Sequence, residues 1–302
     1  MASSLISGLR SVAINVPDLD AAEKFYTEVW RLNVVAKTDA IYLAGSGSDA
    51  YLLSLHKGSE TPEIRKVTLR ACNETALDTI VAAALRAGGK VLKNRASQVE
   101  LGGGQCVVIA DLDGRIFEVV YGDTQQANGD AQKDTPIRLA HAVLNAHDAS
   151  TAQAFLEAVF GFTLIDKTGI MAFMNCNSDH HSLAFGITDN DALNHIAFVM
   201  PDVDAVMRGG GRMKDAGHAI EWGPGRHGPG NNTFNYFIDP CGVVIEYTAD
   251  VEQVDDSYIV GMPTDWKWPA GRVDQWGISA PPSAKLKEAQ KLVKFINPAL
   301  FV

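Results

Sequence analysis

The strongest constraint on the fold of this chain is an internal duplication. The segment RSVAINVPDLDAAEKFYTEVWRLNVV begins at Arg10, and a similar segment, RLAHAVLNAHDASTAQAFLEAVFGFTLI, begins at Arg138. Aligning Phe25 with Phe155 gives an offset of 155 − 25 = 130 residues. Because self-similarity at a fixed offset indicates a repeated structural unit, the sequence predicts two tandem domains of the same kind.

Each half divides again into two units of the same order. The β-branched residues that alternate in Ser11–Val16 predict a strand. Apolar residues recur at helical spacing in Leu19–Trp30, after Asp18 at the expected N-cap. Short strands follow, and a similar order returns in residues 64–121. Four such βαβββ modules before Asp250 predict an α+β fold with two domains, each a half-open barrel of paired modules.

These units also set the expected domain boundaries. The N-terminal domain is expected to span residues 1–123 and the C-terminal domain residues 137–250. The segment Thr124–Pro136 between them is polar, contains Gly and Pro and has no periodicity, so we expect a linker.

Residues 251–302 form a tail outside the repeat. The tail contains three tryptophans near prolines, a composition that is not typical of a disordered end. Such large apolar rings are expected to be buried. We therefore expect the tail to pack on the C-terminal domain and to flank its pocket, with Tyr258 and Trp268 nearest to it. A subunit interface is the alternative, and both can hold together.

Composition excludes some classes of function. The chain has 302 residues and a formal net charge of -10, which disfavours nucleic acid as a partner. We see no signal peptide and no apolar run of membrane-spanning length, so no membrane partner is expected. The four cysteines form no C-x-x-C pair, which fits a reducing cytoplasm.

The duplication provides an internal control for candidate functional residues. A residue that only serves the fold should tend to match its counterpart in the other half. Three histidines of the second half lack a histidine counterpart, whereas one glutamate has a glutamate counterpart. With the first-half residue in parentheses, these positions are His141 (Ser11), His181 (Tyr51), His195 (Lys66) and Glu246 (Glu118). Specialised chemistry in the second half explains this pattern better than chance.

His141, His195 and Glu246 have the residue types of a facial triad. Two histidines and one carboxylate leave three coordination positions open on one side of a divalent metal, and imidazole suits Fe(II). Lys66 would repel a divalent ion at the corresponding place in the first half, and Ser11 is a poor ligand. We therefore expect the metal in the C-terminal domain and none in the N-terminal domain.

Three motifs together resemble a known family. They are Leu193-Asn-His195-Ile-Ala-Phe, Gly223-Pro-Gly-Arg-His227-Gly and Asn235-Tyr236-Phe-Ile-Asp-Pro-Cys-Gly-Val-Val-Ile-Glu246-Tyr. Over about residues 5–280 the chain resembles the type I extradiol ring-cleaving dioxygenases of the vicinal-oxygen-chelate superfamily, which include catechol 2,3-dioxygenases. The resemblance implies the glyoxalase-like fold of that superfamily.

The resemblance also implies roles for individual residues. His141, His195 and Glu246 match the metal ligands, and His181 matches the acid–base histidine near bound dioxygen. Tyr236 matches a tyrosine that contacts a substrate hydroxyl, and His227 matches a histidine of the pocket. His180 is expected to point to the other face of its strand, because side chains of a strand alternate.

Trp222 marks a departure from some relatives. Relatives that act on catechols with a carboxylated side chain carry an arginine before Gly-Pro-Gly-Arg-His, whereas this chain has Trp222. Trp222 is therefore expected to contact a substrate with a neutral ring or an apolar substituent. A Trp222 that packs away from the site is equally compatible with the sequence.

The reaction implied is extradiol cleavage of a catechol by O2 at a mononuclear non-heme Fe(II), giving a muconic semialdehyde-type product. Mn(II) accepts the same ligands, and relatives are commonly homo-oligomers. Two alternatives stay open on the same fold. One is a glyoxalase-like isomerase or lyase, which usually draws four ligands from paired modules. The other is a metal-free binding protein, which has no need of this ligand trio.

Overall fold

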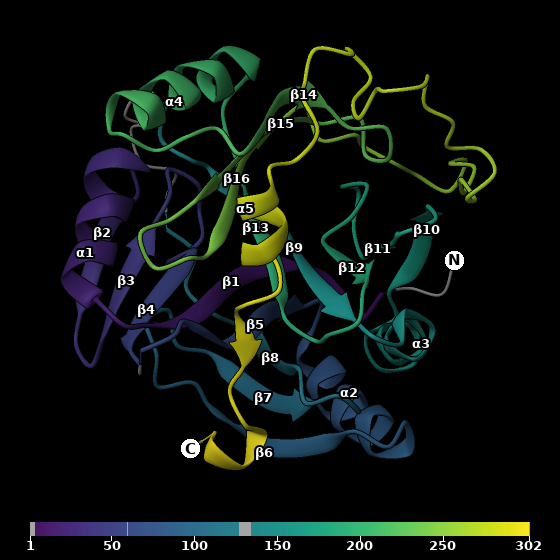
Figure 1. The fold of residues 1–302 in the computed structure, drawn as a ribbon. Helices are drawn as coiled ribbons and strands as arrows, with labels where there is room; N and C mark the ends of the chain where they lie inside the picture. The colour runs from purple at the N-terminus through teal and green to yellow at the C-terminus, as the bar shows by residue number, and fades with distance from the viewer. Residues whose placement is uncertain (1–3, 59, 127–133, 302) are drawn as a thin grey trace.

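The computed structural model describes residues 4–58, 60–126 and 134–301, and its elements follow the duplicated order of the sequence. Most of the expected linker, residues 127–133, lies outside the described residues. Figure 1 shows two open sheets with helices around them and a C-terminal tail that runs across both.

The first half forms one sheet from two βαβββ modules. Its first module consists of β1 (Ile6–Val16), α1 (Leu19–Lys24), a π-helical turn (Phe25–Val29), β2 (Asn33–Lys37), β3 (Ala40–Ala44) and β4 (Leu53–Lys57). Its second module consists of β5 (Glu63–Ala71), α2 (Glu74–Arg86), β6 (Lys90–Ser97), β7 (Gln105–Ala110) and β8 (Ile116–Tyr121). The strand order is β2-β3-β4-β1-β5-β8-β7-β6, so the modules join through β1 and β5.

The second half repeats this arrangement. Its first module consists of β9 (Arg138–Ala146), α3 (Ala149–Phe160), β10 (Thr163–Lys167), β11 (Met171–Asn175) and β12 (Leu183–Ile187). Its second module consists of β13 (Leu193–Val199), α4 (Val203–Asp215), β14 (Trp222–Arg226), β15 (Thr233–Ile238) and β16 (Val244–Ala249). The order β10-β11-β12-β9-β13-β16-β15-β14 matches the first sheet strand for strand. The predicted α+β fold of paired, open βαβββ modules is confirmed.

The same capping device begins the helix of every module. In each case an Asp or Asn side chain accepts a hydrogen bond from the backbone N–H three residues later, which satisfies a donor that the helix leaves unpaired. The four caps are Asp18, Asn73, Asp148 and Asp202. Local sequence therefore fixes where each helix starts.

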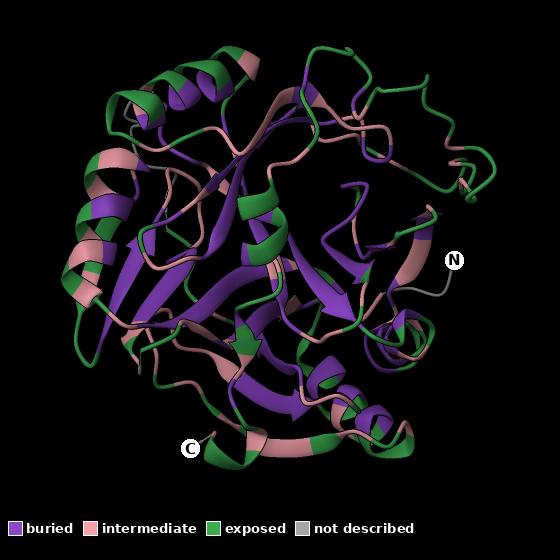
Figure 2. Cartoon of the chain, viewed as in Figure 1, coloured by how far each residue is buried: buried purple, intermediate pink, exposed green. Residues whose placement is uncertain are grey.

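One hydrophobic core extends through both halves. Trp30 stacks on Tyr247 with ring centroids 3.6 Å apart, and the hydroxyl of Tyr26 donates to Asp239 Oδ2 at 2.9 Å. Tyr26 and Trp30 belong to the first module and Tyr247 and Asp239 to the fourth. Figure 2 shows long stretches of the central strands in the colour of buried residues.

The tail continues beyond the second sheet. It contains α5 (Ala284–Ala289), β17 (Lys294–Phe295) and a 3-10 helix (Pro298–Leu300). Leu286 and Ala289 of α5 pack against the second sheet, but β17 pairs in parallel with β5 of the first sheet (Figure 1). The sequence did not predict this second contact. None of the helices in the described ranges combines the length and apolarity needed to cross a bilayer.

Candidate metal centre

The register of three neighbouring strands places His141, His195 and Glu246 on one face of the second sheet. Ala197 of β13 pairs with His141 on β9 and with Glu246 on β16. His195 lies two residues before Ala197 on the same strand, so the two side chains point to the same face. Residues paired across strands also share a face, which brings the three side chains together.

The three ligand atoms form a nearly equilateral triangle. His141 Nε2 lies 3.2 Å from Glu246 Oε2, His195 Nε2 lies 3.3 Å from the same oxygen, and the two Nε2 atoms lie 3.3 Å apart. Ligands at right angles around an ion with bonds of roughly 2.1 Å would be about 3.0 Å apart. The triangle therefore fits one face of an octahedral ion, and this group of residues could hold a metal.

Burial and neighbouring groups set the protonation states of these side chains so that they can bind a cation. Burial lowers the pKa of His195 to about 4, so its imidazole is neutral at pH 7 and can act as a ligand. Burial alone would raise the pKa of Glu246. The contacts with His141, His195 and His227 outweigh burial and hold that pKa well below its ordinary value. A buried carboxylate of this kind needs a positive partner.

Hydrogen bonds from neighbouring side chains orient His195. Its Nδ1 donates to Asn194 Oδ1 at 2.8 Å, and Gln290, just after α5, donates to the same oxygen at 2.8 Å. Asn194 in turn donates to Asn145 at 2.8 Å. Such partners fix the tautomer of a metal-binding histidine. His141 Nδ1 is buried and has no such partner among the described residues.

Sequence reasoning missed these supporting residues. Asn194 directly precedes His195 in the quoted motif, so its position was a usable signal. Asn232, which donates to Glu246 Oε1 at 3.4 Å and to Thr248 at 2.7 Å, had a weaker signal in the same loop as His227. Gln290 lies far from the site in sequence, and nothing marks it.

The other expected site residues surround the triangle. The ring of His181 stacks on His141 with centroids 4.4 Å apart. The hydroxyl of Tyr236 lies 3.4 Å from His195 Nε2 and 3.1 Å from His227 Nε2. Burial raises the pKa of Tyr236 well above its ordinary value, so this phenol keeps its proton at neutral pH.

Trp222 lies beside these aromatic residues. Its ring stacks on Tyr236 at 5.0 Å between centroids and meets the His227 ring edge-on at 5.3 Å. Phe234 packs against both Trp222 and His227. Trp222 therefore helps form the aromatic wall next to Tyr236 and does not turn away from it.

The expectation for His180 was wrong. His180 Nδ1 lies 3.0 Å from His181 Nδ1, so the two rings meet and do not diverge. Alternation of side chains holds only within a strand. The two residues lie before the first residue of β12, Leu183, where the backbone is not in a regular strand.

The first sheet keeps the same register but places an ion pair where the second sheet has the triangle. Lys66 pairs with Ala13 as His195 pairs with Val143, which confirms the alignment of the two halves. Lys66 Nζ lies 2.9 Å from Glu118 Oε1 and 2.6 Å from Glu100 Oε1. The cation is thus supplied by the chain itself, and a domain without metal stays a prediction.

Comparison with known proteins agrees with this arrangement of modules. The profile of the Glyoxalase/Bleomycin resistance protein/Dioxygenase superfamily matches residues 8–119 and 138–247. The chain belongs to this superfamily. Each match covers one pair of modules, so both halves carry the superfamily's signature.

Individual relatives carry different names. A Mn(II)-bound glyoxalase from Novosphingobium aromaticivorans is 32% identical, with a TM-score of 0.86, over 99% of this chain and 98% of that one. Metapyrocatechase 2 of Cupriavidus necator is 33% identical over 50% of this chain, and the match spans only 47% of that protein. Biphenyl-2,3-diol 1,2-dioxygenase of Metapseudomonas furukawaii is 24% identical over 84% of this chain and 90% of that protein.

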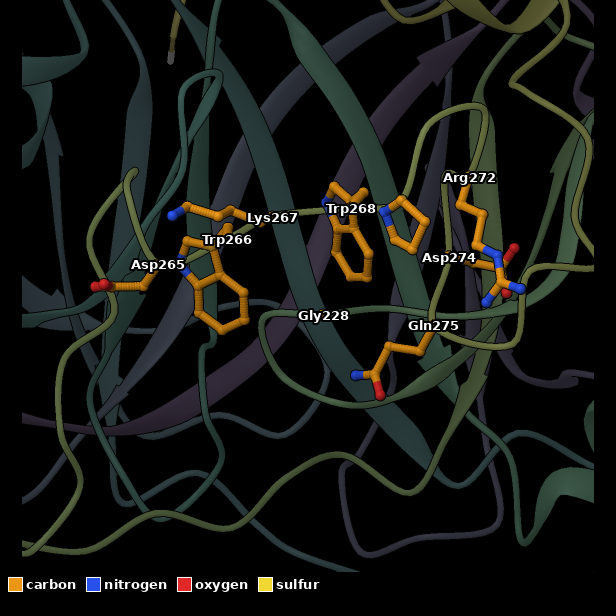
Figure 3. Close-up of a pocket in the computed structure, with 9 residues that line it drawn as sticks. Gly228, Asp265, Trp266, Lys267, Trp268, Arg272, Asp274 and Gln275 are labelled. Atoms are coloured by element: carbon orange, nitrogen blue, oxygen red, sulfur yellow. The ribbon is translucent and has the colours of Figure 1, made fainter.

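The tail covers the loop that carries His227. A cavity of about 350 Å³ lies between this loop and the tail, lined by Trp266, Trp268 and Arg272 among others (Figure 3). A Cβ at Gly228 would lie 2.4 Å from the Trp268 ring, so any larger residue would displace that ring. Gln275 donates to the backbone oxygen of His227 at 2.5 Å. The tail therefore holds this loop in place.

Removal of the tail from Val254 onward is expected to weaken the second domain. It would expose the surface under Leu286 and remove the Gln290 contact to Asn194. Full burial of one leucine is worth about 1.5–3 kcal/mol, so we expect a loss of at least roughly 3 kcal/mol and a Tm lower by roughly 6–12 °C. Calorimetry measures both quantities. A chain ending at Ile296 is the matched control, and wild-type stability in the longer deletion would contradict the expectation.

Proposed function

We propose that this chain is an extradiol dioxygenase, which opens the ring of a catechol with O2 at a mononuclear Fe(II) held by His141, His195 and Glu246. The observation that carries the proposal is the triangle of three buried ligand atoms. Its sides measure 3.2, 3.3 and 3.3 Å, and three protonatable side chains stand around it. A facial triad of this type leaves room for two oxygens of a diol and for O2.

The ion, when bound, would lower the pKa of a coordinated diol and hold diol and O2 side by side. His181 is buried next to His141, and burial lowers its pKa well below the ordinary value, so the imidazole is neutral at pH 7 and has a lone pair for a substrate proton. Tyr236 keeps its proton and can donate a hydrogen bond to a substrate oxygen. His227 lies 3.1 Å from that hydroxyl and orients it.

Two named relatives support the choice of reaction, and a third supports a divalent metal. Metapyrocatechase 2 and biphenyl-2,3-diol 1,2-dioxygenase are named for diol substrates. The Mn(II)-bound relative supports a divalent metal without deciding between iron and manganese. We propose Fe(II) because imidazole and carboxylate ligands with open positions on one face suit the oxygen chemistry of iron.

The aromatic wall favours an uncharged substrate. Trp222 and Phe234 lie next to Tyr236 and His227, and none of these side chains carries a fixed positive charge. We propose a catechol with a neutral ring or an apolar substituent. A cytoplasmic location and a homo-oligomer fit this function and stay predictions.

The deciding experiment is anaerobic loading of the full chain with Fe(II), followed by O2 uptake and visible absorbance. The panel is catechol, biphenyl-2,3-diol, 1,2-dihydroxynaphthalene and 3,4-dihydroxyphenylacetate. We expect one O2 consumed per diol, a yellow product, and the poorest turnover for the acidic substrate. Absence of O2 uptake with every diol would overturn the proposal.

A glyoxalase-type isomerase is the second candidate, because the Mn(II)-bound relative carries that name. The ligand triangle comes from one domain, and the corresponding place in the other holds Lys66, Glu118 and Glu100. Incubation of the Mn(II)-loaded chain with a 2-oxoaldehyde and glutathione tests this candidate. Thioester formation without O2 uptake would favour it.

A further inference from the structure

A line of buried polar side chains runs from His181 into the interior of the second domain. His181 Nδ1 lies 3.0 Å from His180 Nδ1, and His180 Nε2 lies 2.8 Å from Asp166 Oδ2. Asp166 and His180 are both fully buried. Each contact is within hydrogen-bond distance, so the line is continuous from the metal centre to a carboxylate on β10.

The tail holds Asp166 in place. The backbone N–H of Gly261 donates to Asp166 Oδ1 at 2.6 Å, and the hydroxyl of Tyr258 donates to Oδ2 at 3.0 Å. The Tyr258 ring also meets His180 edge-on, with centroids 5.6 Å apart. His180 Nε2 is the third neighbour of the Asp166 carboxylate, which therefore accepts a hydrogen bond from each of three donors.

This arrangement determines which nitrogens carry protons. An accepting Asp166 requires the proton of His180 to sit on Nε2. For neutral rings, His180 Nδ1 then has a lone pair and accepts from Nδ1–H of His181. The second nitrogen of His181, Nε2, is left with a lone pair, which is the form that a base requires.

We propose that Asp166 and His180 are positioning residues that fix the tautomer and ring orientation of His181. Phe173 supports this role, because its ring meets His180 and His181 edge-on at 5.8 and 5.0 Å and limits their rotation. A base oriented by a third group is a recurrent arrangement in enzymes. The inference rests on the proposed function, since it gives His181 a proton to move.

The alternative is that Asp166 and His180 only stabilise the loop before β12. The two roles differ in how they depend on His181. A positioning role acts through His181 and should vanish when His181 is absent, whereas a structural role should persist. The comparison therefore uses Asp166→Asn in two backgrounds, the wild type and His181→Ala.

In the Fe(II)-loaded full chain, Asp166→Asn places an amide donor where the carboxylate accepted. We expect kcat to fall roughly 10- to 100-fold, the range found for partners that orient metal-bound histidines. Iron content and the KM for the diol should stay at the wild-type values. In the His181→Ala background the same substitution should leave kcat unchanged.

Two further variants complete the comparison, one with a milder change at Asp166 and one as a control. Tyr258→Phe removes only one donor to Asp166 and keeps the ring, so it should give a smaller loss with the same dependence on His181, even if Asp166→Asn fails to fold. His147→Gln breaks the exposed pair between His147 and Asp191, at 2.6 Å, and is the matched control without effect on kcat.

Equal losses of kcat in both backgrounds, or no loss in the wild-type background, would overturn the positioning role. Loss of iron in Asp166→Asn and Tyr258→Phe would also overturn it, since the pair would then serve the fold. Failure of the wild type to consume O2 with any diol would overturn the proposed function and this role together. An active wild type with an unaffected Asp166→Asn would overturn this role alone.

Discussion

Replacement of Glu246 by alanine is expected to abolish metal retention and ring cleavage together. Glu246 is fully buried and supplies the only negative charge of the triangle, 3.2 and 3.3 Å from the two imidazole nitrogens. Two neutral histidines alone cannot offset a divalent charge in a buried site. Elemental analysis after gel filtration should fall from a single ion per chain to background, and O2 uptake should fall below detection. His195→Ala should behave in the same way.

The duplication supplies a matched control for this experiment. Glu118→Ala removes the corresponding carboxylate of the first domain, where Lys66 Nζ lies 2.9 Å away. This variant should retain the metal but lose stability, by up to about 3–5 kcal/mol, because it weakens the pairing of a buried cation. Full iron in Glu246→Ala, or loss of iron in Glu118→Ala, would contradict the assignment of the metal to the second domain.

The fold was predictable because the pattern of one βαβββ module occurs four times along the sequence. Each module starts with a strand, followed by an Asp or Asn that caps the next helix, as at Asp18 and Asp148. These signals are local, so they can be read without knowledge of tertiary contacts. The pairing of modules then follows from the repeat, since a single module cannot bury both faces of its sheet.

Part of the candidate site was predictable for a related reason. His141 and His195 stand where the first half has Ser11 and Lys66, and equivalent positions of a duplicated fold share the same register. The structure brings these two histidines together with Glu246, which the comparison of the halves did not single out because its counterpart is Glu118. The internal control was useful because the fold constrains both halves equally.

Residues that act through long-range contacts were not predictable. Asp166 is 180 − 166 = 14 residues from His180 in the chain, and its other partners, Tyr258 and Gly261, lie in the tail. No periodicity links such positions. The two-residue strand β17 is too short to show alternation, so its pairing with the first sheet also left no pattern in the sequence.

His181→Ala should separate catalysis from metal binding. The side chain of His181 stacks on the ligand His141 but is not one corner of the triangle, so the variant should retain iron and bind the diol. Turnover should fall by about 10²–10⁴-fold, the usual contribution of a positioned acid–base group. Steady-state O2 uptake, with iron content measured on the same samples, gives both quantities.

The size of this loss should depend on which property of His181 is removed. His181→Ala also leaves an empty space beside His141. His181→Gln is the more specific variant, because its side chain fills most of that space but cannot exchange a proton near neutral pH. If proton transfer is the role, both variants should lose a similar factor in kcat. If His181 only packs against His141, His181→Gln should recover most of the activity, and iron content should track kcat in both. Unchanged turnover in either variant would remove His181 from the reaction. The 3.0 Å contact to His180 would then have to be explained by the stability of the loop alone.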